Sequence, residues 1–278
     1  MIKIRRARRS DKRAVRDICA RIWTDDYVPN VFDAWLPDRR GGLWVAVVDA
    51  RVVAVAKLTL LGDREAWLHG LRVDPRYQRR GIATALLDHR VDRARRLGAR
   101  VARLDTSEDN VAVRRLMRRF RFRRIARVHY FHATPSAVDP PRSARARELD
   151  ALWRLARGRL LHGDYTTRLL IRADVARAIR AHSCFAVGSI GRPRAVAIAE
   201  AQTPAQGRPH FGSRLRIRIV AGTPAATREL LVALRGQARA ARVARAGIAP
   251  PDDLSRAVRA AGYRRRWQDA MFVFERRL

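Results

Sequence analysis

The chain has 278 residues, of which 47% are apolar, so it is long enough for two domains with ordinary hydrophobic cores. Sixty basic residues against twenty-six acidic ones give a formal net charge of +34. No run of about eighteen uncharged apolar residues exists, which excludes a membrane-spanning helix, and the basic N-terminus lacks the apolar segment of a signal peptide.

The first half predicts helices and strands in succession. A strand at residues 2–4 precedes a helix that Ser10 or Asp11 caps, and a turn-rich aromatic stretch then holds a short helix at 31–35. The further elements expected are strands at 43–48, 52–61 and 65–73, a helix at 81–97, a strand at 101–104, a helix at 110–119 and a strand at 123–132. This order predicts the α/β (α+β) class, with a mixed, mostly antiparallel sheet flanked by helices.

The second half predicts a similar series after a linker rich in proline. We expect domains at 1–134 and 148–278, joined by the linker 135–147. The expected elements are a helical entry at 151–170, strands at 185–188, 195–200 and 215–221, a helix that Thr223 caps with Pro224 in its first turn, a strand at 244–248, a helix at 252–261 and a strand at 270–275. The order is that of residues 43–132.

A glycine stands between the strand at 65–73 and the helix that follows it. The first amides of a helix have no internal acceptor and carry partial positive charge, so such a junction suits phosphate. Gly81 lets the backbone approach an anion because it has no Cβ, and Gln78, Arg79 and Arg80 add donors. The spacing is neither the dinucleotide fingerprint nor the P-loop, and an ordinary basic turn is the alternative.

The segment Gln78-Arg-Arg-Gly-Ile-Ala83 closely resembles the Q/R-x-x-G-x-G/A signature of the GCN5-related N-acetyltransferases (GNAT), and the order of elements up to about residue 132 matches that family. The resemblance implies acetyl-CoA as cosubstrate, with its pyrophosphate on the loop amides and its pantetheine against the preceding strand. The cofactor contacts it implies are Leu71, Arg72, Val73, Gln78, Arg79, Arg80, Gly81, Ile82, Ala83, Thr84 and Asn110.

In that family an amine attacks a thioester, so a base must take a proton from the amine. Glu65 and His69 share one sheet face, and His69, which lies nearer the expected thioester, titrates in the useful range. A polar residue that lines the cleft without proton transfer is the alternative for His69. The family's tyrosine acid is replaced by Met117, which donates no proton, so Tyr130 or a water is the expected donor; an ordinary strand residue is the alternative for Tyr130.

The acceptor side of this fold comes from the first two helices and the loop between them, here residues 23–37. Acid is scarce in the chain, yet this stretch holds three aspartates among four aromatic residues, and carboxylates beside aromatic rings suit a cationic amine. The pattern D-Y-V-P-x-x-F-D-x-W-L also resembles the histidine N-acetyltransferases, which acetylate a free amino acid. The expected substrate contacts are Asp26, Tyr27, Phe32 and Trp35. Core packing of the aromatic residues is the alternative.

The second half lacks the phosphate-binding pattern. Gly222 precedes its long helix, but the signature spacing is absent and Pro224 removes an amide. Residues 110–122 and 252–263 nevertheless resemble each other. We therefore predict a tandem arrangement in which the second half is a degenerate GNAT-like domain that packs on the first and shapes its acceptor cleft. An unrelated α+β cap is the alternative.

Cysteine usage and charge complete the prediction. Cys19 and Cys184 lie far apart without metal-ligand spacing, so we expect no metal, no disulfide framework and a reducing cytoplasm. The basic charge is spread along the chain; it attracts nucleic acid non-specifically, or it reflects an arginine-biased composition.

We expect an acetyl-CoA-dependent N-acetyltransferase, an acyltransferase acting on the amine of a small molecule, with a free amino acid as one candidate. A nucleic-acid-binding protein on a GNAT scaffold and a non-catalytic acyl-CoA sensor stay open. No membrane partner is expected, and the sequence leaves the oligomeric state open.

Overall fold

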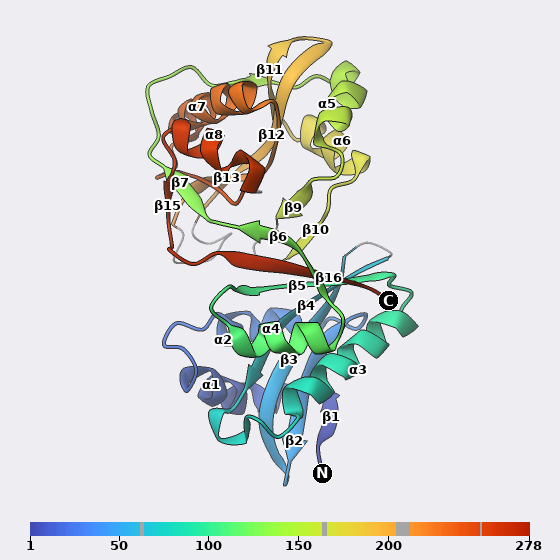
Figure 1. The fold of residues 1–278 in the computed structure, drawn as a ribbon. Coiled ribbons are helices and arrows are strands. Elements are labelled where there is room, and N and C mark those ends of the chain that lie inside the picture. The colour runs from blue at the N-terminus through green and yellow to red at the C-terminus, as the bar shows by residue number, and fades with distance from the viewer. Residues whose placement is uncertain (62–63, 163–165, 204–211, 251) are drawn as a thin grey trace. The chain divides into compact units, whose positions relative to one another are not determined.

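The β-branched runs of the first half form strands, and its amphipathic runs form helices (Figure 1). The computed structural model describes the chain except for residues 62–63, 163–165, 204–211 and 251. The strands of this half are β1 (Lys3–Arg6), β2 (Gly42–Val48), β3 (Arg51–Leu61), β4 (Glu65–Val73), β5 (Val101–Ser107), β6 (Arg123–Val128) and β7 (Phe131–Ala133). The helices are α1 (Lys12–Ala20), α2 (Val28–Trp35), α3 (Ile82–Arg96) and α4 (Val111–Arg119).

The second half has more elements than the sequence predicted. Its helices are α5 (Leu149–Ala156), α6 (Arg172–Arg180), α7 (Pro224–Ala240) and α8 (Ser255–Ala260). Its strands are β8 (Arg142–Ser143), β9 (Leu160–His162), β10 (Thr167–Leu169), β11 (Cys184–Ser189), β12 (Arg192–Gln202), β13 (Arg214–Gly222), β14 (Ala246–Ile248), β15 (Arg264–Arg265) and β16 (Met271–Arg277). The expected helical entry at 151–170 consists of α5 and the β9–β10 pair, with residues 163–165 outside the described residues. Helix α6 was not predicted.

The two seven-stranded sheets have the same plan. One has the order β1-β2-β3-β4-β5-β16-β6, and the other, counted from its opposite edge, the order β8-β11-β12-β13-β14-β7-β15. In each sheet the first four strands are antiparallel, and the fourth pairs in parallel with the fifth. The predicted fold class, a mixed and mostly antiparallel sheet flanked by helices, is confirmed, and the shared order is what a tandem arrangement requires.

The boundary between the two compact units does not follow the predicted halves of the sequence. The chain divides into a unit of Met1–Asp105, Val111–Arg123 and Phe274–Leu278 and a unit of Thr106–Asn110 and Arg124–Val273. Strand β7 pairs with β14 and β15 within the second unit. The prediction of one strand at 123–132 was therefore wrong, because the run breaks at His129 and Tyr130 and its two parts join different sheets.

Strand β16 falls in the first unit from Phe274 onward. Strand β16 lies beside β5 although more than a hundred residues separate them in sequence (Figure 1). The amide of Leu278 donates to the carbonyl of Arg100 at 2.9 Å, and Arg103 Nε donates to Glu275 at 2.7 Å. The chain terminus thereby completes a sheet that begins at β1.

Helices cover both faces of the first unit's sheet. Alternate residues of β2 and β3 point to opposite faces, as strand geometry requires. One face packs against α1 and α2 through the buried residues Val15, Cys19, Val28, Phe32, Leu43, Val45 and Val55. The other packs against α3 through Trp44, Ala46, Val53, Ala54, Ala56, Ile82 and Leu86. No helix in the described part of the chain is both long and apolar enough to cross a membrane.

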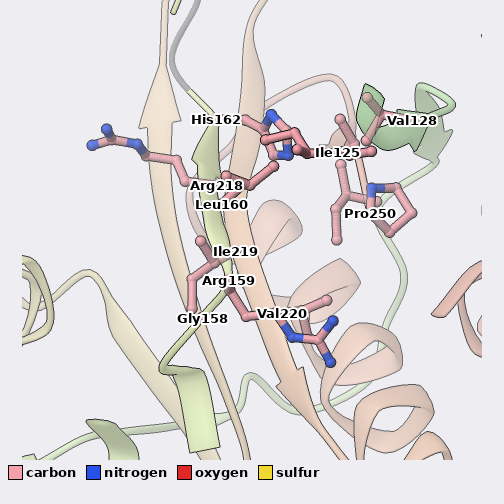
Figure 2. Close-up of a pocket in the computed structure, with 13 residues that line it drawn as sticks. Ile125, Val128, Gly158, Arg159, Leu160, His162, Arg218, Ile219, Val220 and Pro250 are labelled. Carbon is pink, nitrogen blue, oxygen red and sulfur yellow. The ribbon is translucent and has the colours of Figure 1, made fainter. Parts of the chain in front are cut away.

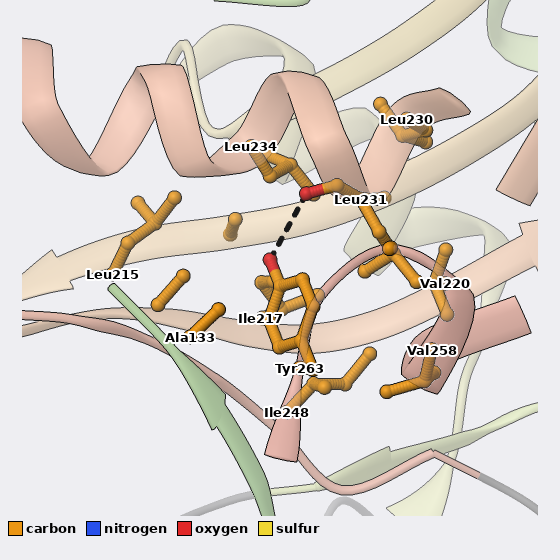
Figure 3. Packing of buried hydrophobic residues seen from close by; sticks show 14 of the residues in the cluster. Ala133, Leu215, Ile217, Val220, Leu230, Leu231, Leu234, Ile248, Val258 and Tyr263 are labelled. Atoms are coloured by element: carbon orange, nitrogen blue, oxygen red, sulfur yellow. Dashed lines mark hydrogen bonds between the residues drawn. The ribbon is translucent and has the colours of Figure 1, made fainter. Parts of the chain in front are cut away.

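The second unit repeats this layering. Its β12 presents Ala195, Ala197 and Ala199 to the core that contains α7 and α8. It presents Val196 and Ile198 to the core that contains α5 and α6. Figure 3 shows the first of these cores, where the hydroxyl of Tyr263 donates to the carbonyl of Leu231 at 3.1 Å.

The two units also begin with the same ion pair. Arg5 on β1 binds the Asp11 carboxylate through two hydrogen bonds of 2.7 and 2.8 Å. Arg142 on β8 binds Glu148 in the same two-pronged way at 2.8 and 2.7 Å. In both cases the acid follows the arginine by six residues and also accepts a backbone amide three residues earlier, at 2.7 and 3.0 Å. Arg168 and Asp174 repeat the pattern before α6, so it is a local feature of strand–helix junctions in this chain.

Removal of residues 271–278 should unfold the first unit preferentially. The deletion takes away a strand and exposes buried side chains, each worth about 1.5–3 kcal/mol. Hydrogen exchange of the β5 amides and thermal unfolding of the truncated chain measure the effect.

The single substitution Arg277→Ala is the control, because it alters one exposed residue of the same strand. Unchanged protection of β5 in the truncated chain would show that β16 is dispensable.

Candidate active site

The loop between β4 and α3 leaves several helix amides without an internal acceptor. Arg79 and Gly81 both have left-handed backbones, with φ of 62° and 78°. Helix α3 begins at Ile82 without a side-chain cap, and its first turn closes with the amide of Ala85 on the carbonyl of Gly81 at 2.9 Å. The amides at 82–84 therefore point to an acceptor from outside the helix. We call residues 78–84 the loop cradle.

Space is open above the loop cradle. No atom of the described chain stands within 4 Å of a Cβ built on Gly81, so glycine is not required here by a protein neighbour. Its absent side chain instead leaves room for a ligand at the start of α3. The fit to a pyrophosphate group is good, because unpaired amides and the positive end of the helix converge on this space.

The side chains around the loop cradle are tied back to the strand end. Asp74 accepts the backbone amide of Arg76 at 3.1 Å and binds the guanidinium of Arg76, which holds the pKa of that carboxyl below its usual value. Gln78 Nε2 donates to the carbonyl of Val73 at 3.4 Å, and Arg80 lies over the ring of Tyr77 at 5.1 Å. These contacts fix the turn that presents the amides.

Strands β4 and β5 pair only at their beginnings. The parallel register runs from Glu65 with Val101 to Trp67 with Arg103, whereas β4 continues to Val73. On its other side β4 stays paired with β3, with one register shift. The predicted pantetheine contacts Leu71, Arg72 and Val73 thus lie on the part of β4 that has left β5.

The register shift falls at Gly70. Its φ is +64°, and a Cβ there would lie 2.8 Å from a ring atom of Trp35. The buried guanidinium of Arg90 on α3 donates to the carbonyls of His69 at 3.3 Å and Lys57 at 3.2 Å, on the two strands beside the shift. Burial lowers the pKa of Arg90 to about 9, so it stays a cation at neutral pH.

The two titratable residues predicted on β4 have different surroundings. His69 is only 9% exposed; its Nε2 lies 2.9 Å from the hydroxyl oxygen of Thr59, and its ring packs edge-on against Trp35 at 4.7 Å. Glu65 accepts from Arg103 at 2.6 Å, where β4 and β5 are still paired. The structure therefore places His69, and not Glu65, beyond the point where the strands separate.

The other predicted residues occupy the start of α4 and the second unit. Asn110 directly precedes α4, and its amide donates to the carbonyl of Ser107 at 3.1 Å. Met117 is buried in α4. Tyr130 lies in the second unit, edge-on to Trp267 at 5.0 Å.

The predicted acceptor aspartate is already paired. Arg72 donates to the two carboxylate oxygens of Asp26 at 2.5 and 3.0 Å, and the Asp26 side chain is 2% exposed. The same guanidinium lies over the rings of Trp23 at 4.4 Å and Tyr27 at 5.5 Å. Phe32 is fully buried in the core. This segment therefore presents aromatic surface around a neutralised ion pair, and not a free carboxylate at Asp26.

Sequence reasoning missed Arg90, Gly70 and Thr59 as parts of the site. A signal existed for Arg90, which lies among the apolar positions of α3, between Leu86, Leu87 and Val91. Nothing local marks Thr59, because its partner His69 lies on the neighbouring strand.

A sheet whose fourth and fifth strands separate beside an uncapped helix start has the geometry that the GNAT resemblance implies. Residues 6–122 match the family model described as Acetyltransferase (GNAT) family. This part of the chain is a GNAT acetyltransferase domain, and the match supports N-acetyltransferase activity.

Solved structures share the fold over both halves. A candidate acetyltransferase from Thermoplasma acidophilum aligns with a TM-score of 0.65 at 18% identity, over 99% of this chain and 100% of its own. A GCN5-related N-acetyltransferase from Sphaerobacter thermophilus aligns with a TM-score of 0.69 at 13% identity, over 99% and 95%. At these identities the likeness concerns the fold. A comparison with curated proteins gives no match.

Gly81→Val should abolish acetyl-CoA binding in a folded protein, because the new side chain fills the open space of the loop cradle. Gly98→Val is the matched control: Gly98 also has a positive φ and open space, but it lies past the other end of α3. Both variants carry a similar backbone cost of about 1–2 kcal/mol. Calorimetric titration with acetyl-CoA separates them; equal affinity in both variants would contradict the cradle.

Proposed function

We propose that the chain transfers acetyl from acetyl-CoA to the primary amine of a small molecule, and that free amino acids are the first acceptor class. The observation that carries the proposal is the loop cradle, placed at the end of a strand that has left its parallel neighbour. Acetyl transfer follows from the family; the acceptor class rests on the local chemistry described below.

The loop cradle and the freed part of β4 would hold the cosubstrate. The amides at 82–84 bind its pyrophosphate, and the backbone at 71–73 lies where an extended arm replaces the missing strand partner. Bound acetyl-CoA supplies an activated thioester. The protein then has to orient the acceptor amine and take one proton from it.

We assign the proton acceptor to His69. Its Nε2 faces the hydroxyl of Thr59, which is half-buried and therefore links the imidazole to the accessible side of the sheet. The hydroxyl takes a proton from the ammonium while it gives its own proton to the imidazole. Glu65 is held by Arg103 and serves the sheet. Because Met117 donates no proton, a water is the proposed donor to the departing thiolate.

The acceptor would meet aromatic faces and one exposed carboxylate. Trp23 is 50% exposed, and Asp25, two residues further on, is exposed as well. The Arg72–Asp26 pair fixes the surface between Trp23 and Tyr27. A small ammonium compound suits this set, since it gains from aromatic faces and from the carboxylate.

Turnover of an amine panel tests the acceptor class. Free amino acids, an amino sugar, a polyamine and a lysine peptide are each incubated with acetyl-CoA, and the released thiol and the product mass are recorded. We expect acetylated free amino acids with the parent chain and none with Gly81→Val. Turnover of the peptide alone would contradict the small-molecule assignment.

His69→Gln should lower kcat by about a hundredfold, a typical contribution of a positioned base, and leave acetyl-CoA affinity within about twofold. The acidic limb of the kcat/KM profile against pH should also disappear. Glu65→Gln is the control, because it removes a charge from the same strand and should leave that limb in place. An unchanged profile in His69→Gln would assign the imidazole to packing.

A further inference from the structure

A pocket of about 150 Å³ lies in the second unit where β13 and β14 separate (Figure 2). Their parallel pairing ends at Ile217 with Ile248, while β13 continues to Gly222. Ile219 and Val220 line the pocket from β13. Ile248, Ala249 and Pro250 line it from β14 and the residues after it. The second sheet thus has an opening at the same strand pair as the first.

The remaining walls make the pocket largely apolar. Strand β6 contributes Ile125, Ala126 and Val128, and the segment through β9 contributes Gly158, Arg159, Leu160 and His162. An apolar cavity of about 150 Å³ accommodates one six-membered ring. Size and lining together favour a monocyclic ligand.

The two lining arginines are already neutralised by carboxylates. Arg159 binds Asp253 at 3.1 Å, and Arg218 binds Glu200 at 3.1 Å. Figure 2 shows the guanidinium of Arg218 pointing away from the other lining side chains. The pocket therefore offers an anionic ligand no uncompensated lining cation, and a neutral ligand fits better.

His162 provides the polar group of the apolar wall. Its Nδ1 lies 3.1 Å from the hydroxyl oxygen of Thr167, and among the described residues the structure gives Nε2 no hydrogen-bond partner. Burial, followed by the charge of Arg216, lowers the pKa of His162 to about 4, so the ring is neutral at physiological pH. Depending on the tautomer, Nε2 donates or accepts, and a hydroxyl group matches either case.

The pocket is not the thioester end of a second acetyl-CoA site. A Cβ on Gly222 would lie 2.5 Å from the carbonyl oxygen of Arg194, so the strand end is closed off by protein. The hydroxyl of Thr223 accepts from the amide of Ala226 at 3.3 Å, and Pro224 has no amide to donate. Helix α7 thus offers fewer free amides than α3.

We propose that the second unit binds a neutral monocyclic compound with one hydroxyl group, with its ring between β13, β14 and β6 and its hydroxyl on His162 Nε2. All of the lining residues fall in the second unit, which includes β6 from Arg124 onward although β6 pairs in the first sheet. The second half lacks a phosphate-binding loop, and this site gives it a binding function of its own.

Ligand-observed NMR with phenol and toluene tests the proposal on the full chain. The two probes have the same shape and differ in the hydroxyl. We expect saturable binding of both, with phenol about fivefold tighter, as one additional hydrogen bond provides. In His162→Leu the two probes should bind equally.

Leu160→Trp fills the pocket and should abolish binding of both probes while acetyl-CoA affinity stays unchanged. Ile125→Trp serves the same purpose from an exposed position if the first variant does not fold. No saturable binding to the parent chain, binding that survives both tryptophan variants, or a phenol preference retained in His162→Leu would overturn the proposal.

Discussion

The break in β4 at Gly70 is the constraint on which the first unit's site depends. Strand β4 has to stay paired with β3 while it leaves β5 after Trp67, and a left-handed residue allows this change of register. Trp35 packs where a Cβ would stand, and Arg90 donates to the carbonyl of His69 beside the break. Burying a guanidinium costs several kcal/mol unless hydrogen bonds offset it, and here carbonyl oxygens do so. The break in β4 and the buried charge of Arg90 are therefore parts of one arrangement.

Several of the few acidic residues in this arginine-rich chain lie at junctions between a strand and a helix. Burial, the largest single effect, would raise the pKa values of Asp11, Glu148 and Asp174, but an arginine on the preceding strand and a backbone amide together outweigh it and lower them. A lowered carboxyl pKa contributes stability that is present above the unfolded value of about 4 and is lost as pH falls through the folded value. The large positive charge thus coexists with a folded core because each of these carboxylates is matched locally.

Local patterns in the sequence predicted the positions of helices and strands better than they predicted which elements pair with one another. The limits of β4 and the start of α3 follow from alternation and from a glycine, both of which are local signals. No local signal predicts that β16 pairs with the first sheet, because the alternation of an amphipathic strand would suit either sheet. Asp26 was predicted to contact the substrate for the same reason, because its partner Arg72 lies forty-six residues away in the sequence. The pocket beside His162 joins segments that only the fold brings together.

The pairing of β16 with the first sheet has a consequence for folding during synthesis of the chain. The first five strands of the first sheet lie within residues 3–107, yet its sixth strand, β16, spans Met271–Arg277. Domains usually fold one after another from the N-terminus. Here the first sheet includes a strand that begins only at Met271, so a nascent chain that has not reached β16 lacks a strand from the interior of that sheet. The exchange also makes the two halves depend on each other, because removal of either half would take a strand from the other's sheet.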